Sequence, residues 1–158
     1  MSTNHNDVPR TDVQFSIFLI NKPGVLAQVL QHLAERKINV TALSIMESTE
    51  HGVLRVVVED AEKARKAVRE LDMHVTEQQV LTATLPNRPG AMSDVVARLA
   101  GEHINVHYAY CTTGGAGNKT LGILKVSDHA KAVKVLTERK PQRRLDSSPI
   151  KRGVVRRK

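Results

Sequence analysis

The chain has 158 residues and a mass of 17.5 kDa, enough for one ordinary domain or two small ones. Hydrophobic residues make up 41% of it, but there is no Trp and only two Tyr and two Phe, which favours thin α/β layers packed by aliphatic side chains. No stretch approaches the roughly 20 apolar residues that span a bilayer. The polar start lacks the apolar segment of a secretory signal. We therefore expect a cytoplasmic protein without a membrane partner.

Charge and cysteine content narrow the class further. The single cysteine, Cys111, excludes an intramolecular disulfide and a multi-thiolate metal site. The net charge of +8 comes mostly from residues 138–158, which hold nine Lys/Arg against two acids. A basic end that contains Pro and Ser is typical of a tail, so we do not expect nucleic acid to be a partner. Residues 1–12 form a polar leader and 139–158 a basic tail in this interpretation.

The first elements follow from hydrophobic periodicity. Residues 13–20 alternate as in a half-buried strand, with apolar side chains at every second position from Val13. Pro23 and Gly24 end this strand. From Val25 onward apolar residues recur at helical spacing, which predicts an amphipathic helix over 25–37.

The rest of the first unit returns to strands and then to a helix. Residues 38–46 and 53–59 have strand character and are separated by a turn at 48–52, which predicts a hairpin. Residues 60–71 predict a second helix with Asp60 as its N-cap. Residues 73–85 are long enough to end one unit and begin another.

The chain contains an internal repeat. Residues 21–40 align without a gap on residues 87–106, and nine of these twenty positions are identical. Residues 53–68 then align on 121–136, after a two-residue gain in the second copy. Two copies of one βαββαβ unit are the simplest explanation.

This element order predicts an α+β fold with antiparallel sheets. A right-handed crossover leaves a gap for a strand of the second half, which gives the split βαβ or ferredoxin-like sheet with both helices on one face. The other face needs a partner, either the second unit or another subunit. We assign the units to residues 13–79 and 80–138. The second unit lacks a good last strand, so either another segment completes its sheet or its edge pairs across a dimer.

At "NKPGVLAQVLQHLAERKINV" (21–40) and "NRPGAMSDVVARLAGEHINV" (87–106) the chain resembles the ACT domain family. The pattern is a strand, a polar-x-Pro-Gly turn, an amphipathic helix, and an Ile-Asn strand that begins 17 residues after the first residue of the turn. The tandem arrangement is similar to small stand-alone bacterial proteins with two ACT units. The resemblance implies regulation without catalysis. It also implies a ligand, usually an amino acid, at the turn and helix N-terminus where domains or subunits meet.

The chemistry of the turn agrees with that role. A helix N-terminus presents unpaired N–H groups and partial positive charge, which suit a carboxylate. Glycine leaves room for close approach to the backbone. Asparagine offers both donors and an acceptor to an amino acid. The predicted ligand-binding residues at the two turns are Asn21, Lys22, Pro23, Gly24, Val25 and Leu26, and Asn87, Arg88, Pro89, Gly90, Ala91 and Met92. The simpler alternative is that both turns only join a strand to a helix.

The two copies differ in the strand after the helix. Ala42 and Ser44 of the first copy are replaced by Tyr108 and Tyr110, which share one face of a strand. The tyrosines are predicted either to line the ligand pocket or to fill an interface between two sheets. The histidines are scattered, and no metal-binding spacing or catalytic set occurs. We therefore expect no metal, no cofactor and no catalytic residues.

The sequence thus predicts a non-catalytic regulatory protein that binds an amino acid and forms a homodimer. The alternative is a regulatory subunit of an amino-acid biosynthetic enzyme, similar to the small subunit of acetolactate synthase, in which case an enzyme or another regulator is a partner.

Overall fold

The computed structural model describes residues 8–47, 51–115 and 119–138. The predicted tail at 139–158, most of the predicted leader and the tips of the two hairpins lie outside these residues. Among the described residues, no helix has the length and apolar character needed to cross a membrane.

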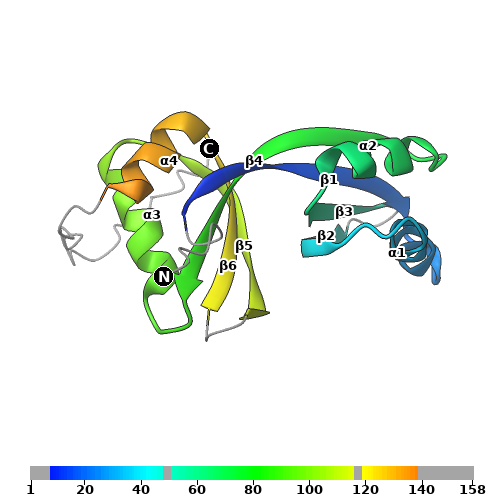
Figure 1. Ribbon diagram of the computed structural model, residues 1–158, viewed down its shortest axis with the longest axis horizontal. Helices are drawn as coiled ribbons and strands as arrows, with labels where there is room; N and C mark the ends of the chain where they lie inside the picture. Colours follow the sequence, from blue (N-terminus) through cyan, green and yellow to red (C-terminus); the bar gives the residue numbers. More distant parts are fainter. Residues whose placement is uncertain (1–7, 48–50, 116–118, 139–158) are drawn as a thin grey trace, which may run out of the picture.

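The described chain forms six strands and four helices (Figure 1). The strands are β1 (Arg10–Ile20), β2 (Val40–Glu47), β3 (His51–Val58), β4 (Val75–Pro86), β5 (Val106–Gly115) and β6 (Lys119–Val126). The helices are α1 (Val25–Glu35), α2 (Ala61–Arg69), α3 (Ala91–Gly101) and α4 (His129–Thr137). The predicted order of strands and helices is confirmed, with ends that differ by a few residues.

All the strands join one antiparallel sheet in the order β2-β3-β1-β4-β6-β5. The first four positions of this order are the predicted ferredoxin-like arrangement, in which the last strand of the unit lies beside the first. We call the part with α1, α2, β2 and β3 the first unit, and the part with α3, α4, β5 and β6 the second unit. The strands β1 and β4 run through both units, so the strand pairing does not test the predicted boundary between units 13–79 and 80–138, which stays a prediction.

The second unit is completed by the N-terminal end of β1. This strand begins at Arg10 instead of the predicted Val13, and Arg10–Val13 pair with Gln79–Thr82 of β4. These residues take the position of the last strand of the second unit, for which the sequence alone offered no good candidate. Pairing satisfies backbone groups of β4 that would otherwise form an open edge. Of the two alternatives, completion by another segment is therefore the one that the structure contains.

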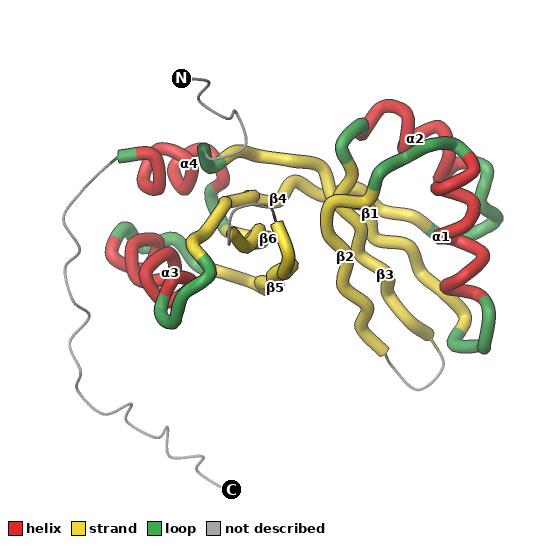
Figure 2. The backbone as a smooth tube through the Cα atoms, turned by 60° about the horizontal axis from the view of Figure 1, so that its bottom comes forward, coloured by secondary structure: helices red, strands yellow, loops and turns green. Residues whose placement is uncertain are grey.

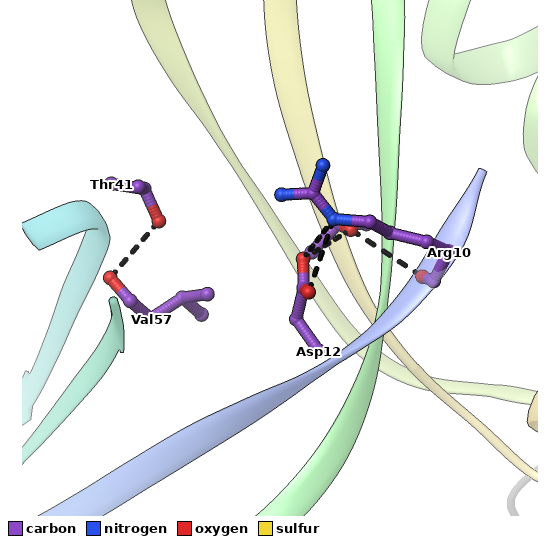
Figure 3. A network of polar contacts seen from close by, with 5 residues as sticks. Arg10, Asp12, Thr41 and Val57 are labelled. Atoms are coloured by element: carbon purple, nitrogen blue, oxygen red, sulfur yellow. Dashed lines mark hydrogen bonds and ion pairs between the residues drawn. The ribbon is translucent and has the colours of Figure 1, made fainter. Parts of the chain in front are cut away.

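Side-chain hydrogen bonds stabilise the start of β1 and a bulge in β2 (Figure 3). Arg10 Nε lies 2.9 Å from the carboxylate of Asp12, which also accepts a hydrogen bond of 2.7 Å from the hydroxyl of Thr82. This links the first residues of β1 to β4. In β2 a bulge between Val40 and Ala42 removes Thr41 from the ladder, and its hydroxyl donates to the carbonyl of Val57 at 3.0 Å.

Each pair of helices covers its own core. The buried stripe of α1 is Val29 and Leu33, as its periodicity predicts. The carboxylate of Asp60 caps α2 by accepting the N–H of Lys63 at 2.9 Å, which confirms the predicted N-cap. The first core contains buried residues between 15 and 68, and the second contains buried residues between 81 and 136. The two helical layers therefore share no buried side chain.

The other unit covers part of the sheet face without helices. Figures 1 and 2 show the helix pairs at opposite ends of the molecule with the strands between them. A small third cluster of Ala42, Val57, Val80 and Ile123 lies on this inner face and draws on both units. The partner that the sequence required for the open face is thus the second copy of the unit.

Candidate functional site

The first Asn-x-Pro-Gly turn joins β1 to α1. The backbone N–H of Lys22 donates to the carbonyl of Ile20 at 2.8 Å, and Gly24 has the positive φ of 91° at the N-cap of α1. No side chain caps this helix. All four residues of the turn are exposed, whereas Val25 and Leu26, which follow it, pack against the first core.

The second turn repeats this backbone between β4 and α3. The N–H of Arg88 donates to the carbonyl of Pro86 at 2.9 Å, and Gly90 has φ 83°. Its four residues are also exposed. Ala91 is buried in the second core, and Met92 packs against that core with its methyl group over Gly122.

The turn glycines serve the backbone conformation. A Cβ added to Gly24 would meet no atom within 4 Å, so space does not explain the residue. The positive φ explains why glycine stands here, because this conformation costs other L-residues about 1–2 kcal/mol. The reason inferred from sequence, room for a ligand, is thus joined by a conformational one.

The charges at the two helix N-termini differ. In the second unit Asp94 lies in the first turn of α3, and its carboxylate is 2.6 Å from the guanidinium of Arg88. The first turn of α1 has no acidic residue, and Gln28 stands at the position equivalent to Asp94. Lys22 is exposed near this acid-free helix N-terminus. The second site already holds a carboxylate of its own, whereas the first does not.

The tyrosines form a hydrogen-bonded cluster on the inner face. Gln14 of β1 is fully buried, and its amide nitrogen donates to Tyr108 Oη at 2.8 Å. The hydroxyl of Tyr110 donates to the amide oxygen of Gln14 at 3.0 Å. Burial, and to a lesser extent Tyr108, raises the pKa of Tyr110, so this hydroxyl stays protonated. The guanidinium of Arg55 lies 4.1 Å from the centre of the Tyr108 ring.

This cluster does not meet either turn. Gln14 and the end of β1 at Ile20 are six residues apart, about 20 Å along a strand. The two turns themselves lie at opposite ends of the antiparallel β1–β4 pair. The structure thus places Tyr108 and Tyr110 between the units, the other location that their sequence allowed. The role of Gln14 was not predicted from the sequence. The alternation of the strand shows only that this side chain points away from the helices, and it does not show which residue it contacts.

A groove of about 340 Å³ lies between α2 and the start of β4. Its lining includes Arg65, which already pairs with Glu77 at 2.8 Å and with Glu62, and none of the predicted ligand residues. Within residues 8–47, 51–115 and 119–138, no group of three or more His, Cys, Asp or Glu side chains could hold a metal ion.

Two ferredoxin-like units that share β1 and β4 in one antiparallel sheet, with helices on the outer faces and a Pro-Gly turn before a helix in each, define a tandem ferredoxin-like protein. The chain matches the family model of the ACT domain pair over residues 10–147, and it belongs to this family.

Solved structures with the same fold agree. Protein BT0572 from Bacteroides thetaiotaomicron is 34% identical, with 81% of this chain and 88% of that chain covered and a TM-score of 0.74. The ligand-free regulatory subunit of aspartate kinase from Thermus thermophilus is 17% identical, with 78% and 89% covered and a TM-score of 0.61. The corresponding subunit from Thermus flavus is 17% identical, with 82% and 93% covered and a TM-score of 0.57. A search of curated protein sequences returned no match.

Proposed function

We propose that the protein is a non-catalytic regulator that binds a free amino acid at the first turn, Asn21–Gly24, and at the second turn more weakly. Membership of the ACT domain family supports a regulatory role, and the Thermus proteins with this fold are named as regulatory subunits. The turn offers the groups that an amino acid requires. The carboxylate of the amino acid would accept from the first N–H groups of α1, and the side chain of Asn21 would orient the ligand.

The observation that carries the preference is the difference in charge at the two helices. At α3 the position suited to an anion is already served by Asp94, which pairs with Arg88. A ligand carboxylate would have to compete with this acid. At α1 no acidic side chain lies in the first turn, so the favourable charge of the helix end is available to a ligand.

A second subunit would complete the proposed site, because the first turn is open in a single chain. Five of the large apolar side chains exposed at the surface belong to the first unit and lie on β1 and β2: Phe18, Ile20, Leu43, Ile45 and Met46. Ile20 directly precedes the turn. The edge strand β2 carries no charged side chain from Val40 to Met46, so a copy of itself would meet no like charge. We propose a homodimer across this edge, with the ligand beside the interface.

A binding screen tests the proposal. Each of the common amino acids is added at millimolar concentration, and a ligand specific to the folded state raises the melting temperature. Isothermal titration then gives the affinity, and light scattering gives the mass relative to the 17.5 kDa chain. The absence of any shift across the panel would reject amino-acid binding.

Matched variants locate the site. Asn21→Ala should weaken binding about tenfold or more, the effect of losing a hydrogen bond to a charged group. Asn87→Ala, the equivalent change in the second unit, should leave the tight binding event intact. Asp94→Gln copies Gln28 of the first unit and should strengthen binding at the second turn. Equal losses from Asn21→Ala and Asn87→Ala would contradict the preference for the first turn.

The exposed apolar side chains also favour an alternative, a regulatory subunit of an amino-acid biosynthetic enzyme, similar to the small subunit of acetolactate synthase. In that case the edge strand β2 would contact a larger enzyme subunit. Affinity purification of the tagged chain from its own cells distinguishes the two: a catalytic subunit that is lost with Leu43→Asp supports the enzyme complex, and a dimer of the chain alone supports the homodimer.

A further inference from the structure

The contact between Gln14 and the tyrosines is unusual in its position. Gln14 lies on β1, whereas Tyr108 and Tyr110 lie on β5, and β4 and β6 separate these strands in the sheet. The contact therefore crosses the inner face between the two units. Both polar atoms of the Gln14 side chain are satisfied by β5, and its nitrogen also lies 3.3 Å from Ser16 Oγ.

We propose that Gln14, Tyr108 and Tyr110 form a polar latch that closes the second unit over the first. The latch opens without unfolding either helix-covered core, and the long strands β1 and β4 act as the hinge. The motion is a property of the chain alone and needs no ligand.

The internal repeat shows that a polar residue is not required at this place in the fold. Gln14 stands seven residues before Asn21, and the residue seven before Asn87 is Val80, which is also fully buried on the inner face. The tyrosines likewise replace Ala42 and Ser44 of the first copy. A buried amide is stable only while its hydrogen bonds are made, which fixes one closed arrangement. When the contact opens, water replaces those bonds, so the net cost of opening is small.

The packing allows such a motion because the cores are separate. The first core and the second core contain no common residue. Apart from the β1–β4 ladder, the buried apolar contact between the units is the third cluster of four buried residues, with Tyr110 and Leu121 packed beside it. The guanidinium of Arg55 on β3 also lies over the ring of Tyr108 on β5, and this contact opens with the latch. Opening would expose little apolar surface compared with unfolding of either unit. The sheet pairs on both sides of the hinge would remain.

Hydrogen exchange of the Gln14 side-chain amide tests the latch in the ligand-free chain. Exchange is followed by NMR at several urea concentrations below the unfolding transition. The exchange of the backbone amides of Leu54 and Leu124 is measured for comparison, because they lie on β3 and β6, central strands of the two units. We expect Gln14 to exchange faster than both and to be nearly independent of urea, since a local opening exposes little surface. Tyr110→Phe should speed its exchange roughly three- to tenfold, the loss of one hydrogen bond.

The control is Thr82→Val, which removes the hydroxyl of another buried residue together with its hydrogen bonds to Asp12 and to the carbonyl of Arg10, outside the latch. It should leave the exchange of Gln14 unchanged. Tyr108→Phe, which removes the other hydroxyl, repeats the test independently. The proposal is overturned if Gln14 shares the urea dependence of Leu54 and Leu124, if Tyr110→Phe accelerates all three sites equally, or if Gln14 exchanges as fast as an exposed glutamine.

Discussion

Replacement of Gly24 by Ala tests whether the Pro-Gly turn is imposed by the fold. At φ 91° an alanine would suffer the steric cost of the left-handed region, about 1–2 kcal/mol. A less flexible unfolded chain returns about 0.4–1 kcal/mol of this. The open space around the site adds no clash. With both effects at the middle of their ranges, the net loss is about 0.8 kcal/mol, which lowers Tm by about 2–3 °C for a chain of this size.

Gly101 provides the matched control. It ends α3, a Cβ there would meet no atom within 4 Å, and its φ is not positive. Gly101→Ala should therefore stabilise the protein by up to about 1 kcal/mol. Urea titration followed by far-UV circular dichroism measures both variants, with equal m-values expected. If Gly24→Ala is as stable as the parent chain, or if both variants change in the same direction, the strain argument is refuted.

Three other features give separate predictions. Asp60→Ala and Asp128→Ala remove the N-caps of α2 and α4, and each should cost about 0.5–2 kcal/mol in urea titration; unchanged midpoints would show that the caps contribute nothing. Burial, and then Lys125, lowers the pKa of His129, so the protonated form is disfavoured in the folded chain. Stability from this group is present above its unfolded pKa of about 6.5 and declines below it; an NMR midpoint at or above that value would contradict this. Burial raises the pKa of the Cys111 thiol, so alkylation near pH 8 should be slower than that of a free cysteine, and an equal or faster rate would be inconsistent with it.

Much of the fold could be predicted because its signals are local. The alternation that starts at Val13 and the helical spacing from Val25 identify the strand and the stripe that bury Phe15 and Val29. The repeat then supplied the second unit. The strand that completes the second unit could not be predicted, because Arg10–Asp12 are polar and give no strand pattern. Only the unpaired edge of β4 explains why they extend the strand.

The candidate site could be predicted only in part from the sequence. The turns could be located from Asn21 and Asn87, since Pro and Gly mark them in any context. Their electrostatic difference was not predicted, although it rests on Asp94, six residues beyond Arg88, which a helix brings next to that side chain. The tyrosine pair could be assigned to one strand face but not to Gln14, because the contact joins residues 94 and 96 positions apart.

The sequence by itself determined the two units, the strand-to-helix turns and the family, because periodicity, turn residues and a repeat are properties of neighbouring positions. The tertiary structure decided how the units combine. One sheet joins them because each half offers an unpaired strand edge that the other half can satisfy. The inner face closes because the helices leave the other side of the sheet uncovered in both units, and there Gln14 bonds to the two tyrosines.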